Sequence, residues 1–218
     1  MSKKLDLIKK NIQHHGVPNV LYQYSLKLIN KVMFVNILTC IAISKTNQSA
    51  LNVDPKFDHG FLNEDLLIDY SKNEEHDLPQ DFLEVALSKG DKCYAVTDDG
   101  QLASYGWYSN EKTLTNINEL YFCFDPQYIY MYKGLTNKNY RGQKLHAVGM
   151  SWALNQYMEK GYKGIVSYVE STNFDSLKSC WRMGYEKIGV IYIFKIFGKV
   201  FHYPSRSCRK FDIKLKSV

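Results

Sequence analysis

The chain has 218 residues, of which 45% are hydrophobic and 23% charged, and its formal net charge is +6. This length and balance describe one globular domain that can bury a core without disulfides, and they exclude a collagen-like, disordered or disulfide-scaffold chain. The charge is uneven, because residues 1–50 carry seven lysines and one aspartate, whereas residues 51–100 carry four lysines and thirteen acids. The basic ends are explained either by solvated faces or by a polyanionic ligand, a nucleic acid or an anionic membrane surface.

Cysteine usage and hydropathy bear on the compartment. The five cysteines are odd in number and show neither a Cys-x-x-Cys pair nor the spacing of a metal site. No secretory signal peptide is recognisable. We therefore expect free thiols, no metal and a cytoplasmic location. The longest apolar run, residues 32–43, is shorter than the roughly 20 residues needed to cross a bilayer and predicts a buried strand.

The N-terminal segment predicts two helices, because residues 3–15 and 20–31 each repeat apolar side chains on one helical face among lysines. We interpret residues 1–31 as a helical extension and residues 32–218 as the main domain. The preferred interpretation docks the two helices on the core of that domain, and the alternative is contact with a membrane surface.

The remaining elements alternate between the two periodicities. Helices are predicted at residues 62–70, 79–89, 143–160 and 173–183, and strands at 92–97, 102–109, 119–124, 128–136, 165–170, 188–197, 199–203 and 211–215. The two later helices each connect one strand to the next, which implies parallel pairing around 128–136 and 165–170 in a mixed α/β or α+β sheet. Gly134 interrupts its strand and predicts a β-bulge.

The basic loop before the helix at 143–160 is the most informative segment. A helix N-terminus presents unpaired N–H groups and a partial positive charge, which suit a pyrophosphate. Lys138, Arg141 and Lys144 add charge there, and Gly142 permits close backbone approach. The pattern therefore predicts an anion site, with a solvated basic loop as the alternative.

Two segments together resemble a known superfamily. Residues 140–146, Tyr-Arg-Gly-Gln-Lys-Leu-His, are similar to the Arg/Gln-x-x-Gly-x-Gly/Ala loop of the GNAT superfamily of acyl-CoA-dependent acyltransferases, with Arg141 in the first position. Lys144 and His146 stand where that family usually has small residues. Residues 173–185 look like the family's Asn-x-x-small helix, which closes in Lys/Arg-x-Gly-Phe/Tyr.

This resemblance implies a GNAT-like fold, in which a mixed, mostly antiparallel sheet has two central parallel strands splayed apart and flanked by helices. It also implies acetyl-CoA (coenzyme A) as co-substrate, bound between the splayed strands, and no metal. The cofactor-binding positions that it indicates are Gly134, Leu135, Thr136, Arg141, Gly142, Gln143, Lys144, Leu145, His146, Asn173 and Ser176.

The resemblance further implies a base for the amine and an acid for the leaving thiolate. Glu170 and Glu119 are the candidate bases, and for each the alternative is an ordinary exposed or capping carboxylate. Cys180 occupies the position where many members of the family keep an acidic Tyr. In the favoured alternative Cys180 only packs, and a tyrosine of the strand 128–136, such as Tyr132, is the donor.

The predicted function is an acetyl-CoA-dependent N-acetyltransferase in which a primary amine attacks directly, with a small acceptor such as an amino sugar. The alternatives are a peptide or protein amine acetyltransferase, an aminoacyl-tRNA-dependent transferase on a related fold, and a non-catalytic CoA-binding module. Nucleic acid is an unfavoured partner. A homodimer and peripheral membrane contact through the N-terminal helices are left open.

Overall fold

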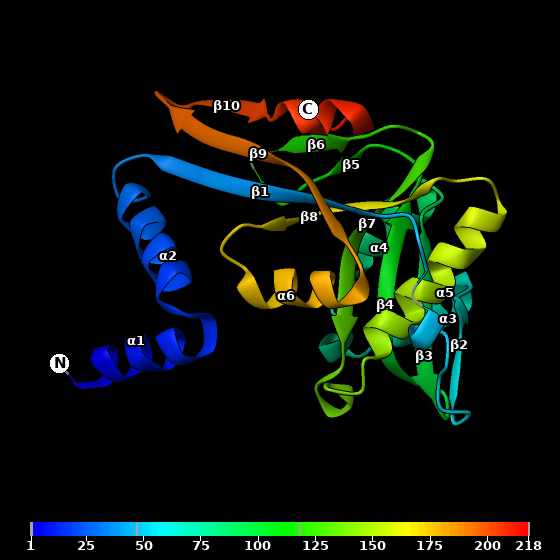
Figure 1. The fold of residues 1–218 in the computed structure, drawn as a ribbon. Coiled ribbons are helices and arrows are strands. Elements are labelled where there is room, and N and C mark those ends of the chain that lie inside the picture. The colour runs from blue at the N-terminus through cyan, green and yellow to red at the C-terminus, as the bar shows by residue number, and fades with distance from the viewer. Residues whose placement is uncertain (1, 47, 118, 218) are drawn as a thin grey trace.

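The computed structural model describes residues 2–46, 48–117 and 119–217 and contains one large sheet and one small sheet. The large sheet is built from β1 (Phe34–Ile43), β2 (Phe57–Phe61), β3 (Lys92–Asp98), β4 (Gln101–Ser109), β7 (Tyr128–Thr136), β8 (Gly164–Glu170), β9 (Glu186–Ile196) and β10 (Lys199–Pro204). Their order across the sheet is β10-β9-β1-β8-β7-β4-β3-β2 (Figure 1). The small sheet has the order β11-β6-β5, from β5 (Thr113–Leu114), β6 (Leu120–Cys123) and β11 (Lys214–Ser217).

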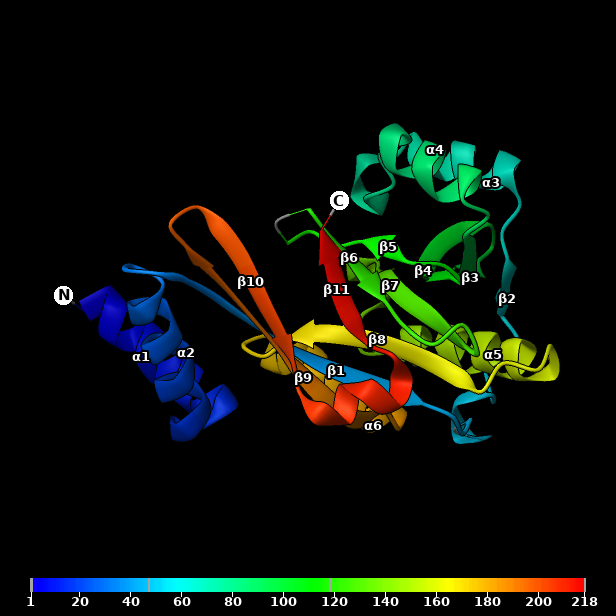
Figure 2. The same ribbon diagram turned by 90° about the horizontal axis from the view of Figure 1, so that it is seen from above.

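The helices are α1 (Ser2–His15), α2 (Val17–Ile29), α3 (Glu64–Ser71), α4 (Gln80–Ser88), α5 (Leu145–Glu159) and α6 (Phe174–Met183), with short 3-10 turns η1 (Gln48–Ala50), η2 (Glu74–His76), η3 (Lys138–Tyr140) and η4 (Arg206–Phe211). Helices α5 and α6 cover one face of the large sheet, and α3, α4 and the small sheet cover the other (Figure 2). This is the predicted α/β sheet flanked by helices. No helix within the described ranges is long and apolar enough to cross a membrane.

The two central parallel strands separate along their length. β7 and β8 pair only at three positions, from Tyr128↔Gly164 to Tyr130↔Val166. Beyond them β7 stays paired with β4 and β8 with β1, so the two strands follow different neighbours. At the point of separation the Ser167 hydroxyl donates to the Met131 carbonyl at 2.7 Å. The splayed strands expected of a GNAT-like sheet are therefore present.

The β-bulge lies two residues before the position predicted for it. Trp107 pairs with Lys133 and Tyr108 with Met131, so Tyr132 is the extra residue in β7, whereas Gly134 is regularly paired with Gly106. Bulges are set by the register of the partner strand, here β4, and a glycine marks only where a strand lacks a side chain.

Strand β1 crosses the middle of the sheet. It runs antiparallel to β8 on one side and to β9 on the other, so a segment from near the N-terminus completes the core. The helices before it contact the domain in several places: Val20 is buried, the Tyr22 hydroxyl lies 2.7 Å from that of Ser171 after β8, and His14 Nε2 lies 3.0 Å from Asp175 Oδ1 of α6.

The strand predicted at 119–124 is present as β6, which lies in the small sheet, and the neighbour of β7 is β4. One predicted element has a different boundary in the structure. The helix predicted from residue 143 begins at Leu145, because Gly142 and Lys144 adopt left-handed backbone with φ of 86° and 61°.

Candidate active site

The basic loop between β7 and α5 ends in a helix without a side-chain cap. The turn η3 is held by the Asn137 side chain, which accepts from the Asn139 N–H at 3.1 Å. After it, left-handed Lys144 stands at the N-cap of α5, and no side chain caps the helix. The N–H groups of Leu145 and His146 donate to no backbone carbonyl of the described chain. Such a series of unpaired N–H groups is a binding site for an anion.

A cavity of about 890 Å³ opens at this helix start. Its wall consists of residues from the end of β7, the basic loop, the first turn of α5, the last turn of α6 and the segment around η1: Ser49, Ala50, Asn52, Thr136, Arg141, Gly142, Gln143, Lys144, Leu145, His146, Ala147, Val148, Ser179, Arg182 and Met183. Of the predicted cofactor contacts, Thr136 and loop residues 141–146 line this cavity. Gly134, Leu135, Asn173 and Ser176 do not line it.

Three basic side chains that line the cavity are available to bind an anion. Arg141, Lys144 and Arg182 have no carboxylate within 4.0 Å among the described residues. By contrast, Lys138 Nζ lies 3.9 Å from Glu75 Oε1 and does not line this cavity. Sequence reasoning left Arg182 out of the site, although it is the basic residue of the Arg182-Met183-Gly184 ending of the second motif.

Gly134 allows His146 to lie against β7. A Cβ atom at Gly134 would stand 2.8 Å from His146 Cε1 and 2.8 Å from Met131 Cε. Burial lowers the pKa of His146, and the nearby Tyr105 carbonyl only partly opposes this, so the imidazole is neutral at pH 7. His146, which stands where the family usually has a small residue, therefore adds an uncharged side chain to the wall of the cavity.

The start of α6 is capped as its sequence indicates. Asn173 Oδ1 accepts from the Ser176 N–H at 3.2 Å. Further along the helix, Cys180 is half-buried against the core formed with Met183 and Tyr185. Burial raises the pKa of the Cys180 thiol to about 11, so it stays protonated at neutral pH.

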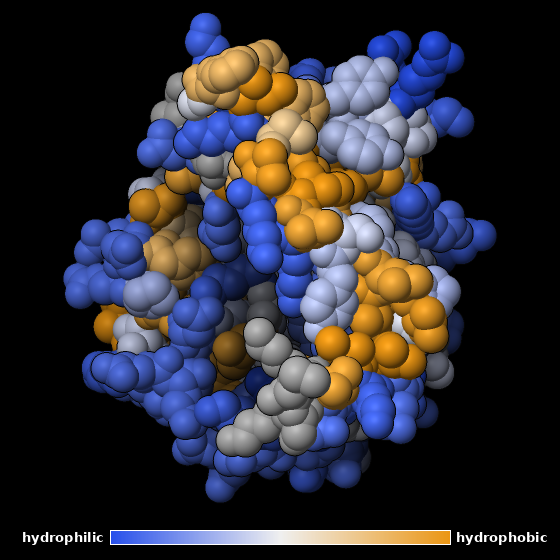
Figure 3. Space-filling model, turned by 90° about the vertical axis from the view of Figure 1, so that its left-hand side faces the viewer, coloured by the Kyte–Doolittle hydropathy of each residue, from blue (hydrophilic) through white to orange (hydrophobic). Residues whose placement is uncertain are grey.

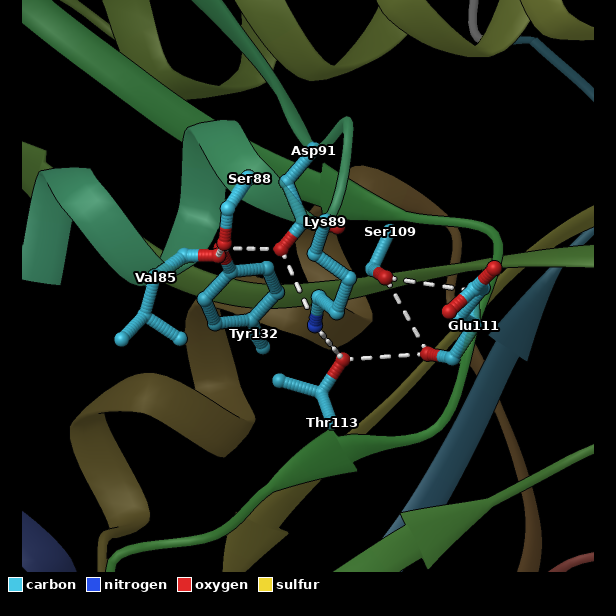
Figure 4. Close-up of polar contacts among 8 residues, drawn as sticks. All are labelled: Val85, Ser88, Lys89, Asp91, Ser109, Glu111, Thr113 and Tyr132. Carbon is cyan, nitrogen blue, oxygen red and sulfur yellow. Dashed lines mark hydrogen bonds and ion pairs between the residues drawn. The ribbon is translucent and has the colours of Figure 1, made fainter.

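A buried polar cluster lies at the bulge of β7 (Figure 4). The Tyr132 hydroxyl donates to Asp91 Oδ2 at 2.7 Å, and Lys89 Nζ lies 3.0 Å from the same oxygen. Lys89 also donates to Thr113 Oγ1 at 2.7 Å. The Asp91 side chain is inaccessible to solvent, and its second oxygen, Oδ1, has no hydrogen-bond partner in the described structure. Burial and the charge of Asp91 hold the pKa of Tyr132 far above its usual value.

This cluster lies beside the splayed strands and contains a carboxylate that can take up a proton. Because the Tyr132 proton points at Asp91, the tyrosine oxygen is left to accept a hydrogen bond from another group. Sequence reasoning missed Lys89 and Asp91, which stand between α4 and β3, outside both motifs. A buried Asp beside a strand carries no local signal in a single sequence.

The two predicted bases lie elsewhere. Glu170 is exposed at the end of β8, where its Oε1 accepts from Asn36 Nδ2 at 3.4 Å. It shares the face of Tyr168, because side chains alternate along a strand. Glu119 is exposed in left-handed backbone just before β6. No contact joins either carboxylate to the cluster of Tyr132 and Asp91 among the described residues.

No protein-family model matches the sequence, and no curated protein matches it significantly. Solved structures do match the fold. A GCN5-related N-acetyltransferase-like protein from Streptococcus suis is 15% identical with a TM-score of 0.52, over 78% of this chain and 66% of that one. A GNAT-family acetyltransferase from Colwellia psychrerythraea is 13% identical with a TM-score of 0.49, over 80% and 57%.

An aminoglycoside acetyltransferase from an uncultured soil metagenomic sample is 10% identical with a TM-score of 0.46, over 61% of this chain and 90% of that one. The chain thus spans about two thirds or less of the length of the first two of these structures. Together with the splayed parallel strands, the match to the Streptococcus suis structure shows that this chain has the fold of the GNAT superfamily.

Proposed function

We propose that the protein is an acetyl-CoA-dependent N-acetyltransferase. The observation that carries this proposal is the cavity at the uncapped start of α5, where unpaired N–H groups and the cations Arg141, Lys144 and Arg182 meet at the end of β7. A pyrophosphate fits this combination, because backbone N–H groups and arginine side chains both bind phosphate oxygens.

The remaining cofactor contacts follow from the separation of the strands. Among the described residues, the edge of β7 that faces away from β4 has no strand partner from Met131 to Thr136, so its backbone can pair with an extended chain. The amides of a pantetheine arm are such a chain. Gly134, Leu135 and Thr136 are the positions that we assign to it, and His146 forms the adjoining wall. When bound, acetyl-CoA supplies the thioester from which the acetyl group is transferred.

We assign proton acceptance to Tyr132 and Asp91, in place of the donor role that the resemblance implied for Tyr132, because burial and Asp91 hold the pKa of this tyrosine far above its usual value. Direct attack forms the bond between the amine nitrogen and the acyl carbon and breaks the bond between that carbon and sulfur. The proton that the amine loses passes to the Tyr132 oxygen while the Tyr132 proton passes to Asp91, at 2.7 Å. Lys89 compensates the negative charge of the buried carboxylate. Glu170, on the same face of the sheet as Tyr132, is the alternative proton acceptor. Glu119 is a less favoured alternative.

Cys180 is a weak candidate for the general acid. Its pKa of about 11 exceeds that of an ordinary thiol, about 8.5. Proton transfer from Cys180 to a leaving thiolate is therefore unfavourable. Because the leaving thiolate is the weaker base, it needs no proton from this residue, and we assign Cys180 to packing.

The acceptor that we propose is a small primary amine, such as an amino sugar. On the face of Tyr132, helices α3 and α4 pack on one side of the splayed strands and the small sheet packs on the other (Figure 2). A face that packed elements cover on two sides leaves less room for a protein chain or a tRNA than for a small molecule.

Calorimetric titration with coenzyme A tests the cofactor proposal. We expect binding, and at least about tenfold weaker binding for Arg141→Glu, because one charge-assisted phosphate contact is lost and a repulsive charge added. Lys163→Glu, which makes the same charge change at an exposed residue in the connection between α5 and β8, is the matched control. Absence of binding, or equal loss in both variants, would contradict the assignment of the pyrophosphate.

Thiol release against a panel of amines then tests the reaction. Release with an amino sugar and not with a lysine peptide supports the small acceptor. The reverse preference would make the protein a peptide acetyltransferase. Coenzyme A binding without release with any amine would identify a non-catalytic binding module, and binding of charged tRNA without coenzyme A binding would favour aminoacyl transfer.

A further inference from the structure

The turn between β9 and β10 exposes a large apolar side chain that the fold does not explain. Phe197 is 100% exposed at the tip of this hairpin. Phe197 and Gly198 both have positive φ, 47° and 78°, as in a type I′ turn, where Asn and Gly are the favoured residues. A phenylalanine that contacts nothing and occupies a disfavoured conformation has no structural role here.

The tip lies beside a second exposed apolar segment. Phe34 at the start of β1 pairs with Lys195, so the preceding Val32, which is 91% exposed, stands at the same end of the sheet as Phe197 (Figure 1). Along α2, Leu21 and Leu28 are 63% and 65% exposed and share one helical face by their spacing of seven. Figure 3 shows apolar surface on this side of the molecule. We call this the apolar end: Leu21, Leu28, Val32, Met33, Phe34, Ile196 and Phe197.

The charge around the apolar end has a single sign. Lys27, Lys31, Lys195 and Lys199 flank it, and none has a carboxylate within 4.0 Å among the described residues. Residues 7–53 and 187–211, which include the whole apolar end, contain no Asp or Glu. Apolar side chains framed by lysines complement an anionic, apolar partner.

We propose that the apolar end binds the surface of an anionic lipid bilayer. The lysines would lie among the acidic headgroups while Phe197 and Val32 enter the boundary with the acyl chains. A second copy of this chain is a poor occupant, because a two-fold contact would bring the same four lysines of each copy together without a carboxylate to neutralise them. The connection between α2 and β1 and the tip of the β9–β10 hairpin both project from the molecule (Figure 1). This shape suits a deformable surface more than a protein pocket.

Co-sedimentation of the full chain with vesicles tests the proposal. One set contains phosphatidylcholine alone, and the other contains equal parts of phosphatidylcholine and phosphatidylglycerol. We expect binding to the mixed vesicles that weakens with added salt, and little binding to phosphatidylcholine. Phe197→Ser is expected to weaken binding about tenfold, and Lys195→Gln with Lys199→Gln about twentyfold or more.

Val85→Ser is the matched control, since Val85 is 66% exposed on α4, away from the apolar end. Each variant is first checked for an unchanged thermal melt. Failure of the parent chain to bind mixed vesicles at low salt, or equal binding by Phe197→Ser and the parent, would overturn the proposal. So would a dimer in sedimentation equilibrium that Phe197→Ser dissociates, because the apolar end would then be occupied by a second copy. None of these outcomes depends on coenzyme A binding.

Discussion

Gly134 offers the sharpest test of how the cavity wall is packed. In Gly134→Ala the new Cβ would stand 2.8 Å from His146 Cε1, 2.8 Å from Met131 Cε and 3.3 Å from the Tyr105 carbonyl oxygen. Favourable carbon–carbon contacts lie at about 3.5–4.0 Å, so two side chains overlap the new methyl group by about 0.7 Å or more. Both are the ends of side chains and can move, which limits the cost.

Overpacking of this kind lowers the free energy of unfolding by about 1–3 kcal/mol. Replacing glycine also makes the unfolded chain less flexible, which raises the free energy of unfolding by about 0.5 kcal/mol. We therefore expect Gly134→Ala to lower the free energy of unfolding by about 1–2 kcal/mol, measured by urea titration. His146→Ala introduced with it should recover part of the loss, because one of the two overlaps disappears.

Gly60→Ala is the control for this experiment. Gly60 also lies in a strand, β2, but a Cβ there meets no atom within 4 Å. Its unfolding free energy should stay within about 0.5 kcal/mol of the parent or rise. If Gly134→Ala matched Gly60→Ala, or if His146→Ala added its own cost without any recovery, His146 would not pack on β7 as described.

Four further outcomes are expected. The lowered pKa of His146 means that the unfolded chain binds more protons below about pH 6.5, so stability present above that pH is lost on acidification, and His146→Gln should flatten the fall in urea midpoints. Tyr132→Phe should reduce the transfer rate about a hundredfold while calorimetric coenzyme A affinity stays unchanged. Cys180→Ala should retain activity within about tenfold, and a larger loss would restore its role as acid. Lys89→Met should cost about 3 kcal/mol in urea unfolding, because Asp91 is left buried without its cation, and Asp91→Asn should recover part of it.

The parts of the fold that sequence patterns predicted are those with local causes. Asn173 precedes α6 and caps it, and Gly142 marks the turn before α5. Alternation located β3 and β4, which pair as a hairpin in the structure. Two motifs in a fixed order then predicted the splayed strands, which the three-position pairing of β7 with β8 confirms.

The parts that were not predicted depend on contacts between distant segments. The bulge falls at Tyr132 because of its register with β4, and the small sheet joins β6 to β11 from the end of the chain. Asp91 meets Tyr132 across 41 positions of sequence. A single sequence shows each of these residues but not its partner, so the cluster of Tyr132, Asp91 and Lys89 was found only in the folded chain.

The central place of β1 has a consequence for how the chain folds. Leu38 pairs with Glu170 on one side and with Ile191 on the other, so its partners are synthesised more than a hundred residues later. Contacts so distant in sequence form slowly, and folding from the N-terminus cannot begin with this strand. During synthesis the apolar run from Phe34 to Ile43 has no partner strand, so it is exposed to aggregation or to binding by a chaperone.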